Sequence, residues 1–369
     1  MKALILSMTT GEGHNSIAKT IAEELTARGI EADVFDIFRC DGFEYRLNKW
    51  GYLFLCKHLP KIYDFCWQRL KFRKSEKRYH GPTQQEVQKV ANKIAEHVDE
   101  LGRDVPVDFF VCVHPYAAIL CDYWRRQGKY RDKKVFAILT DLLPHPLWES
   151  AIQCDYVLTP TKDSFEQLQT KGFAAEQLID CGFPTAKKYA RRDGDLRAKL
   201  GLADNFTVMV TSGGFGIGNN CKVAKLLLKN GVQILCMNGH NKKAYKKTQK
   251  LTAKYPQLHN YAFVDNMDEL MCACDVVVSR GGAGTLFGAL NLGLPIVARE
   301  KLIINERENV DILERAGAVI KLKKLSQLNC VIADLKAHPE KLESMRNACQ
   351  RVTQNRNVAN VCDTIMKLL

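Results

Sequence analysis

Residues 206–229, FTVMVTSGGFGIGNNCKVAKLLLK, indicate the fold class of this chain. The apolar run 206–211 predicts a buried β-strand, and the glycine-rich segment 212–218 predicts a tight turn after it. Residues 221–229 then carry apolar side chains at helical spacing. A strand, a glycine turn and a helix in this order are typical of one unit of a parallel α/β sheet.

The same alternation of strands and helices continues on both sides of this unit. Apolar runs predict further strands at 4–8, 31–37, 109–113, 135–140, 156–159, 232–237, 261–264, 276–279 and 295–298. Helical patterns occupy 16–28 and 84–101, and 344–369 is predicted as a helix without an accompanying strand. Strands that alternate with helices predict parallel sheets covered on both faces.

The 369 residues are too many for one ordinary core and fit two domains. A polar stretch at 187–195 separates the two series of strands. We therefore predict an α/β fold with two Rossmann-like, doubly wound domains, 1–188 and 189–352, that face a central cleft. A helix at 353–369 is predicted to pack back on the first domain. Because ligands bind at the carboxyl ends of such strands, we expect ligand-binding residues in loops 9–15, 114–116, 141–148, 212–218 and 279–285.

The formal net charge of +13 favours polyanionic partners. The 14 cysteines are scattered through the chain, many of them in apolar stretches, and are predicted to be reduced core residues. Because no second Cys or His pair accompanies Cys272 and Cys274, no metal site is expected. The first apolar run is too short for a signal sequence, and no stretch reaches the roughly 18 apolar residues that span a bilayer. We expect a cytoplasmic protein, peripheral on the cytoplasmic face of a membrane.

Two glycine loops in the second half have the composition of phosphate-binding turns. The loop 212–218 offers backbone amides to an anion, but its third glycine comes one residue too early for the dinucleotide fingerprint. The loop 279–285, SRGGAGT, also follows a strand and opens a helix, and 305–309, NEREN, follows the strand at 295–298. The alternative interpretations are tight turns, and a solvated loop with a helix cap at Asn305.

Several motifs occur together in a characteristic order and spacing. They are FVDNMDELMCACD at 263–275, GAGT at 282–285, GLP at 293–295 and EREN at 306–309, with GEGHN at 11–15 and TDLLPHPLW at 140–148 in the first half. In these residues the chain resembles the monogalactosyldiacylglycerol synthases and the bacterial processive diacylglycerol glucosyltransferases. The resemblance covers both predicted domains.

The resemblance implies the GT-B fold, a UDP-hexose donor, a diacylglycerol-type acceptor, and inversion at the anomeric carbon without a bound metal ion. No cofactor is implied beyond the UDP-sugar substrate. The donor-binding residues carried over from the family are Gly213, Gly214 and Gly216 near the diphosphate, Phe263 and Val264 near the uracil, and Gly284, Thr285, Glu306 and Asn309 near phosphate, ribose or sugar. The acceptor-binding residues are Gly13, Asn15, His145 and Trp148.

Two positions depart from the family pattern. Ala283 stands where the family usually has proline, and Gly288 stands where it has a glutamate that helps to bind the ribose.

Transfer to a hydroxyl needs a base beside the acceptor oxygen and stabilisation of the departing diphosphate. His14 lies in the loop after the first predicted strand, and an ordinary pKa near 6.5 suits it to proton abstraction. Asp141, at the end of another strand, is either a competing base or the residue that orients a histidine. A histidine in a glycine-containing loop can also simply cap the following helix.

Residues 43–79 carry ten lysines and arginines against three acidic residues, interleaved with aromatic side chains. This composition suits an anionic bilayer surface. The predicted membrane contacts are Trp50, Lys57, Lys61, Trp67, Arg69, Lys71, Arg73 and Lys74. The alternatives are aromatic packing within the first domain and nucleic-acid binding, which no recognised nucleic-acid module supports.

The predicted function is therefore transfer of glucose or galactose from a UDP-sugar to a diacylglycerol-type lipid at an anionic membrane surface. We keep three alternatives: a transferase for another lipid-linked acceptor such as a peptidoglycan precursor, a UDP-sugar epimerase, and a non-catalytic UDP-sugar sensor. An epimerase turns over without lipid, and a sensor tolerates the loss of His14 and Asp141. The sequence does not indicate the oligomeric state.

Overall fold

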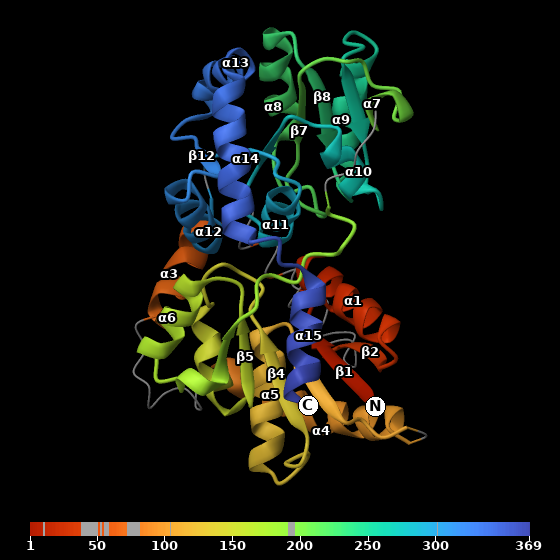
Figure 1. Cartoon of the computed structure of the whole chain (residues 1–369), viewed down its shortest axis with the longest axis vertical. Coiled ribbons are helices and arrows are strands. Elements are labelled where there is room, and N and C mark those ends of the chain that lie inside the picture. The colour runs from red at the N-terminus through yellow and green to blue at the C-terminus, as the bar shows by residue number, and fades with distance from the viewer. Residues whose placement is uncertain are drawn as a thin grey trace. The chain divides into compact units, whose positions relative to one another are not determined.

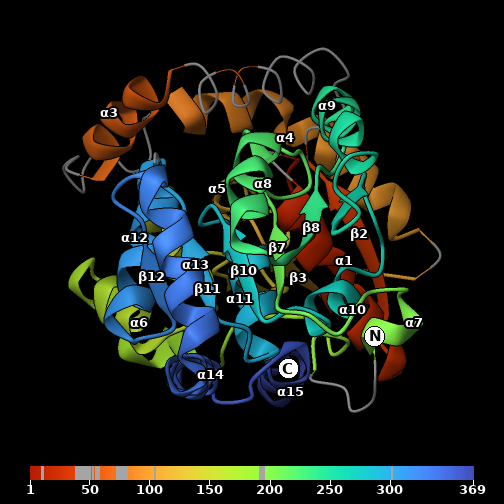
Figure 2. The same ribbon diagram turned by 90° about the horizontal axis from the view of Figure 1, so that it is seen from above.

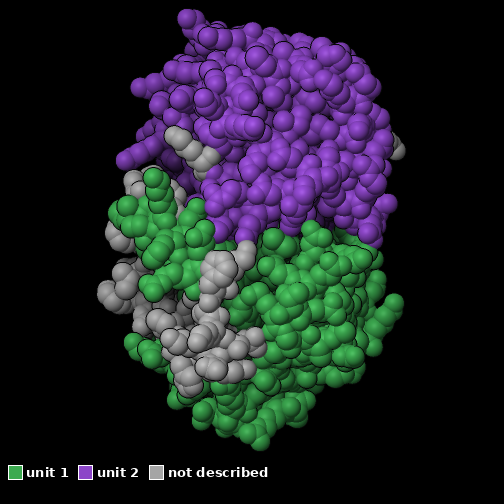
Figure 3. All heavy atoms as spheres, turned by 90° about the vertical axis from the view of Figure 1, so that its left-hand side faces the viewer, with its two compact units in different colours: residues 1–184, 356–369 green, residues 185–355 purple. Residues whose placement is uncertain are grey.

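The computed structural model describes residues 1–9, 12–37, 51, 54, 59–71, 82–103, 105–190, 196–300 and 302–369. The chain forms two compact units, shown in Figure 3: unit 1 comprises residues 1–184 and 356–369, and unit 2 comprises 185–355. The predicted boundaries at 188 and 352 lie close to these limits. The cleft between the domains stays a prediction.

Unit 1 is built on a six-stranded sheet whose strands all run parallel (Figure 1). The strands are β1 (Lys2–Ser7), β2 (Glu31–Asp36), β3 (Phe109–Cys112), β4 (Lys134–Ile138), β5 (Tyr156–Thr159) and β6 (Leu178–Asp180). Their spatial order is β2-β1-β3-β4-β5-β6. The order reverses between β1 and β3, and ligands of doubly wound sheets bind at such a switch point.

Helices cover this sheet. They are α1 (Glu12–Ala27), α3 (Pro60–Lys71), α4 (Pro82–Leu101), α5 (Pro115–Arg126), α6 (Lys162–Thr170) and α15 (Val358–Leu368), with the 3-10 helices η2 (Pro146–Gln153) and η3 (Ala175–Gln177). Apolar residues of α4 and α5, such as Ile94 and Leu120, share one buried cluster with Leu4 and Phe110 of the strands. Burial of this apolar surface is the main favourable contribution to folding.

Unit 2 repeats the architecture with a second parallel six-stranded sheet, in the order β12-β11-β10-β7-β8-β9. Its strands are β7 (Thr207–Val210), β8 (Gln233–Met237), β9 (Leu258–Tyr261), β10 (Val276–Ser279), β11 (Ile296–Ala298) and β12 (Val319–Lys321). Its switch point lies between β7 and β10. The glycine loops 212–218 and 279–285 therefore follow the two strands that flank the switch point.

The helices of unit 2 are α7 (Leu196–Lys199), α8 (Asn220–Leu227), α9 (Lys242–Thr252), α10 (Met267–Cys272), α11 (Ala283–Asn291), α12 (Ile304–Arg315), α13 (Leu328–Ala337) and α14 (Pro339–Thr353), with η4 (Leu228–Asn230) and η5 (Leu325–Gln327). Among them, α13 packs against both α8 and α14, and Figure 2 shows this group from above.

The helix predicted at 344–369 is two helices. Gln354 and Asn355 have φ angles of 50° and 57°, in the left-handed region, which ends α14. The chain then returns to unit 1, where α15 packs on α1 and Arg28 pairs with Asp363. A left-handed residue after the last helical turn is a common way for a helix to end.

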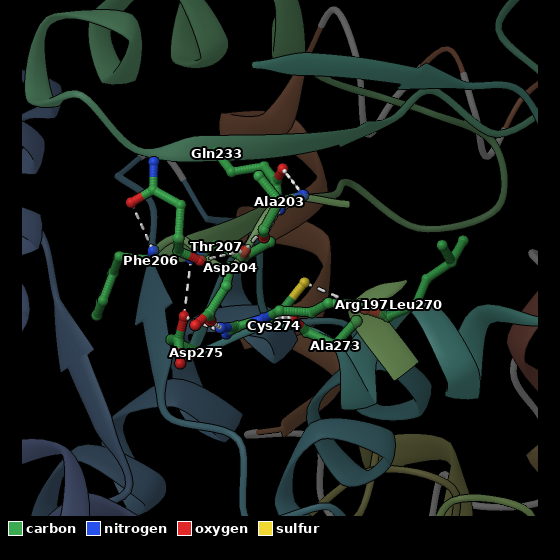
Figure 4. Close-up of polar contacts among 11 residues, drawn as sticks. Arg197, Ala203, Asp204, Phe206, Thr207, Gln233, Leu270, Ala273, Cys274 and Asp275 are labelled. Atoms are coloured by element: carbon green, nitrogen blue, oxygen red, sulfur yellow. Dashed lines mark hydrogen bonds and ion pairs between the residues drawn. The ribbon is translucent and has the colours of Figure 1, made fainter. Parts of the chain in front are cut away.

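The amino edges of both sheets carry networks of ion pairs. In unit 1, Nζ of Lys2 lies 2.7 Å from Glu31 and 3.1 Å from Asp33. In unit 2, Figure 4 shows Asp275 accepting hydrogen bonds from the Thr207 amide and from Arg197, both at 2.7 Å. Buried polar groups are stabilising when they are hydrogen-bonded in this way.

Candidate active site

At the carboxyl edge of the unit 1 sheet, the loops after β1, β3 and β4 converge on one histidine. His14 lies in the first turn of α1, directly after the β1 loop. Its Nδ1 lies 3.0 Å from the carbonyl oxygen of Val113, after β3, and 3.1 Å from Oγ1 of Thr140, after β4. Three neighbouring strands thus fix the position of this imidazole.

These contacts determine which nitrogen of His14 carries the proton. A carbonyl oxygen only accepts hydrogen bonds, so Nδ1 must carry the hydrogen that it donates to Val113. In the neutral ring, Nε2 then holds the lone pair. A histidine whose Nδ1–H is fixed by a backbone carbonyl has the tautomer that a general base requires.

The charge state of His14 follows from its surroundings. Burial lowers the pKa of His14 to about 4, although the hydrogen bond to the Val113 carbonyl opposes the shift. The ring of His114 lies edge-on to that of His14, with 4.7 Å between centroids. Burial lowers the pKa of His114 well below its ordinary value, and the neighbouring His14 and His145 add to the effect. His14 and His114 are therefore neutral near pH 7.

The remaining predicted residues of unit 1 have different surroundings. Asp141 follows Thr140 and is partly exposed, and Gly13 is exposed on the first turn of α1. The side-chain amide of Asn15 accepts a 2.6 Å hydrogen bond from Ser7 and donates one of 2.6 Å to Thr9. Asn15 therefore ties the start of α1 to the end of β1.

Two tryptophan predictions require correction. Trp67 was expected at a membrane surface, but its side chain is 3% exposed and its ring lies 4.1 Å from that of His145. Trp148 was expected to bind the acceptor, but it lies in the buried core of unit 1. Both indoles are large apolar groups, and packing against the domain removes them from water.

The surface of α3 carries other side chains suited to a membrane. Leu59, directly before the helix, and Ile62 and Phe65 on it are exposed, and Phe65 is 57% exposed. Lys61 and Arg69 are exposed beside them, and the Arg69 guanidinium lies 5.7 Å from the centre of the Phe65 ring. We call these five residues the α3 surface. Trp50, Lys57, Arg73 and Lys74 lie outside the described residues, as does the side chain of Lys71. None of the described helices is both long enough and apolar enough to cross a membrane.

In unit 2, the glycine loop after β7 is shaped by close backbone packing. Gly213 and Gly216 have φ angles of 74° and 61°. A Cβ on Gly216 would lie 2.1 Å from the carbonyl oxygen of Asn238, so only glycine fits there. The carbonyl of Gly214 accepts a 2.8 Å hydrogen bond from the amide of His240. The loop is thereby fixed against the end of β8.

An aromatic pair lies beside this loop. Phe263 is 45% exposed, and its ring stacks on that of His240 with 4.2 Å between centroids and 10° between planes. Val264 follows, partly exposed. His240 was not predicted from the sequence, although its position directly after a predicted strand, beside Gly239, is the signal that could have identified it. Two stacked rings provide a face on which a nucleobase can stack.

The second glycine loop opens α11. Gly284 is exposed and Thr285 partly exposed in the first turn of this helix, where backbone amides and the helix dipole favour an anion. A Cβ on Gly281 would lie 2.5 Å from the carbonyl oxygen of Glu306. Asn309 is 1% exposed, and its Nδ2 donates to the Gly281 carbonyl at 3.1 Å. The amide of Asn309 therefore supports the loop from inside, and its predicted role in donor binding stays a prediction.

Glu306 also has partners within the protein. Its Oε2 lies 2.8 Å from Arg280 and accepts a 3.2 Å hydrogen bond from the Ile303 amide at the start of α12. The carboxylate therefore holds Arg280 at the end of β10.

Tyr189 occupies the space beside Gly288. A Cβ at position 288 would lie 2.9 Å from Cε1 of Tyr189, which is tighter than real contacts allow. Burial raises the pKa of Tyr189 to about 12, with a contribution from Asp268. A glutamate at position 288 would require Tyr189 to move.

Comparisons with known proteins match both units. Residues 14–185 match the monogalactosyldiacylglycerol (MGDG) synthase family, and residues 207–361 match the glycosyltransferase family 28 C-terminal domain. The processive diacylglycerol beta-glucosyltransferase of Bacillus pumilus is 26% identical over 94% of this chain and 89% of its own length. Monogalactosyldiacylglycerol synthase 1 of Arabidopsis thaliana is 25% identical over 90% of this chain and 64% of its own length.

A solved structure has the same architecture. The structure of Anabaena Alr3699/HepE in complex with UDP-glucose is 14% identical, has a TM-score of 0.59 and covers 100% of both chains. At this identity the likeness shows the fold, which is GT-B with two Rossmann-like domains. From the two matched regions and the relatives along nearly the whole sequence, we conclude that this chain belongs to the monogalactosyldiacylglycerol synthase and processive diacylglycerol glucosyltransferase family.

Proposed function

We propose that this protein transfers a hexose, glucose or galactose, from a UDP-sugar to a diacylglycerol-type lipid, with inversion at the anomeric carbon and without a metal ion. The observation that carries the proposal is the neutral His14 in the region that matches the MGDG synthases, with its Nδ1–H held by Val113. The names of the curated relatives, which act on diacylglycerol, supply the acceptor class.

The proposed reaction transfers one proton, forms one bond to the anomeric carbon and breaks another. His14 Nε2 accepts the proton of the acceptor hydroxyl as the oxygen attacks the anomeric carbon. The bond from that carbon to the diphosphate breaks, and UDP leaves with the electron pair. Asp141 is the competing base. Because the pKa of His14 is about 4, it is unprotonated at neutral pH, but it is a weaker base than an exposed histidine.

The donor is proposed to bind unit 2. The 212–218 loop and the start of α11 offer amides to the diphosphate, and the Phe263–His240 pair offers a face to the uracil. Among the described residues, the N–H of Gly214 has no hydrogen-bond acceptor, so it can donate to a phosphate oxygen. Backbone donors of this kind stabilise a departing anion without reorganisation.

The acceptor is proposed to be reached at a membrane surface through the α3 surface. Exposed apolar side chains enter the boundary of the lipid headgroups, while the neighbouring cations attract anionic headgroups. This proposal replaces Trp67 with Phe65 as the aromatic membrane contact, because Phe65 is exposed and Trp67 is buried.

The test is incubation with labelled UDP-glucose or UDP-galactose, with and without vesicles that contain diacylglycerol. The expected product is labelled glycolipid from one of the two donors, formed only when vesicles are present. UDP release in the vesicle reaction without any labelled lipid would contradict the lipid acceptor. Turnover of the sugar without vesicles would instead favour an epimerase.

A further inference from the structure

Residues 205–264 of unit 2 are strongly basic, as residues 43–79 are. They contain nine lysines and no arginine, aspartate or glutamate, so they contribute +9 to the formal net charge of +13. The proposed donor site of unit 2 uses none of these lysines. A charge of this size and sign favours a polyanionic partner. The lysines are Lys222, Lys225, Lys229, Lys242, Lys243, Lys246, Lys247, Lys250 and Lys254.

Five of these lysines share one face of α9. Successive side chains of a helix project about 100° apart around its axis, which places the five lysines within an arc of about 140°. All five are exposed. Thr248 lies on the opposite side of the helix and is buried. We call the set the α9 surface: Lys242, Lys243, Lys246, Lys247 and Lys250.

The protein does not neutralise the α9 surface. Across the part of the chain that the structure describes, none of its five lysines forms an ion pair. Lysines that stand three or four positions apart on a helix, such as Lys243 and Lys247, repel each other. Lys242 and Lys243 also stand in the first turn, where the helix dipole disfavours cations. The arrangement is therefore unfavourable for the isolated protein, and an anionic partner would relieve the repulsion.

The opposite face of α9 is hydrogen-bonded to the unit 2 sheet. Nδ2 of Asn260, on the edge strand β9, donates to Oε1 of Gln249 at 2.7 Å and to the carbonyl of Tyr245 at 3.2 Å. At the start of the helix, Oδ1 of Asn241 accepts a 3.0 Å hydrogen bond from the amide of Ala244. These contacts fix the rotation of α9 about its axis, so the lysines stay on the outside of unit 2.

The composition of this region favours an anionic bilayer over a nucleic acid. Arginines that pair with phosphates through two hydrogen bonds and aromatic rings that stack on bases are typical of nucleic-acid recognition. Residues 205–264 contain no arginine, and their exposed phenylalanine, Phe263, already stacks on His240. Lysine is a flexible point charge, and a cluster of about four to eight such charges on one helix is typical of binding to anionic headgroups.

We propose that the α9 surface binds the headgroups of an anionic bilayer, as a contact of unit 2 that is separate from the α3 surface of unit 1. The inference rests on the proposed function, because a lipid acceptor brings the protein to a bilayer. Along α9, whose residues are all described, no large apolar side chain is exposed, whereas the α3 surface includes Phe65. Binding through the α9 surface is therefore electrostatic, without insertion between the lipids, and salt weakens it.

The test measures binding to vesicles of phosphatidylcholine alone and of phosphatidylcholine mixed with phosphatidylglycerol. The α9 variant combines Lys246→Gln with Lys250→Gln. The matched control combines Lys323→Gln with Lys324→Gln, two exposed lysines that follow β12 at the opposite edge of the sheet. A lysine near an anionic surface contributes about fivefold, so the α9 variant should bind the mixed vesicles about 25-fold more weakly at low salt. The control should keep wild-type affinity, and high salt should remove the difference.

Thermal unfolding shows whether the α9 variant is folded. Loss of the repulsion between Lys246 and Lys250 should leave its midpoint equal to or above that of the wild type. If it does not fold, Lys243→Gln with Lys247→Gln repeats the test on the same face.

Three results would overturn the proposal. They are a wild type that does not bind the mixed vesicles, an α9 variant with wild-type affinity for them, and an equal loss of affinity in the control. An α9 variant that binds the vesicles normally but loses affinity for labelled RNA would identify a nucleic acid as the partner instead.

A transfer assay separates this proposal from the proposed function. Diacylglycerol dispersed in a neutral detergent presents the acceptor without an anionic surface, so the α9 variant should form glycolipid there at the wild-type rate. A wild type that binds the mixed vesicles through the α9 surface but forms no glycolipid would contradict the proposed function and keep the surface. Glycolipid formation together with unchanged vesicle binding in the α9 variant would keep the function and remove the surface.

Discussion

The amino and carboxyl edges of the two sheets differ in how their charged groups are satisfied. At the amino edges, Lys2 is held by Glu31 and Asp33, and Asp275 is held by Arg197 and the amide of Thr207. At the carboxyl edges, His14 is neutral with Nε2 holding a lone pair, and Arg299 is buried without a carboxylate partner among the described residues. At the amino edges, the charged groups are paired within the protein. At the carboxyl edges, His14 and Arg299 have hydrogen-bonding or charge-pairing capacity that a ligand can use.

The largest expected effect tests the carboxyl edge of unit 1. His14→Gln should lower kcat for glycolipid synthesis by about 10²- to 10⁴-fold, which is the usual contribution of a general base. The matched control is His97→Gln on the exposed side of α4, which should have wild-type rates. Product formation is measured with the labelled donor. A His14→Gln enzyme with normal rates, beside an inactive Asp141→Asn enzyme, would assign the base to Asp141.

A second prediction distinguishes the two edges by the pH dependence of the free energy of unfolding. Because the folded pKa of His14 is about 4 and its ordinary value is 6.5, the unfolded chain binds more protons between these values. The free energy of unfolding should therefore fall by up to about 3 kcal/mol as the pH drops from 7 to below 4. Urea unfolding at pH 7 and 4.5 should show a smaller drop for His14→Gln than for the wild type. Identical drops would contradict a neutral His14 whose pKa is lowered in the folded protein.

The stabilisation from the amino edge of unit 1 should change with pH in the opposite direction. The hydrogen bond to Glu31 raises the pKa of Lys2 above its ordinary 10.5, although burial opposes this. The stabilisation from Lys2 is present below that value and is lost only as the pH rises through the folded pKa.

A third prediction tests whether the amino edge serves stability alone. Asp275→Asn removes the charge that Arg197 and the Thr207 amide share, and should lower the free energy of unfolding by about 2 kcal/mol. The control is Asp204→Asn, whose exposed pair with Arg197 should contribute less than about 1 kcal/mol. UDP affinity, measured on both variants, should stay at the wild-type value. A loss of UDP affinity in Asp275→Asn at full stability would remove the distinction between the edges.

The smallest expected effect concerns the helix that packs beside the carboxyl edge of unit 1, where Trp67 of α3 contacts His145 after β4. Lys61→Gln and Arg69→Gln should each weaken binding to anionic vesicles by about fivefold at low salt, since a cation near such a surface contributes about 1 kcal/mol. Phe65→Ser should weaken it as well, whereas Lys89→Gln on α4 serves as the control. Sedimentation with vesicles measures the effect. If vesicle binding is changed neither by salt nor by these variants, the α3 surface does not mediate membrane binding.

The sequence predicted the order of strands and helices because most strands are buried runs of apolar residues. β9 is an exception, because the structure places it at Leu258–Tyr261, whereas the prediction was 261–264. This edge strand contains His259 and Asn260 and is only partly buried, so its apolar signal was weak. β6 and β12 are edge strands too, and the apolar pattern missed both for the same reason. The break at Gln354 and Asn355 has no glycine or proline to mark it.

The candidate site was predictable in position but not in detail. Loops after the central strands could be assigned because parallel strands end at one edge, and His14 followed from its place in such a loop. The orientation of side chains could not be assigned. Trp67 and Phe65 are both aromatic residues on α3, and only the packing of the helix shows that the first is buried. Arg299 belongs to no motif, and only the structure shows that it is buried and forms no ion pair with the described residues.

The placement of α15 has a consequence for how the chain is made. Unit 1 is assembled from two segments separated by the whole of unit 2, and α15 buries Val361, Cys362 and Ile365. During synthesis, all of unit 2 leaves the ribosome before the segment that covers α1. Unit 2 can therefore complete its sheet on the nascent chain, while unit 1 waits with an apolar face of α1 uncovered. A chaperone that binds exposed apolar helices would find its substrate in unit 1 during that interval.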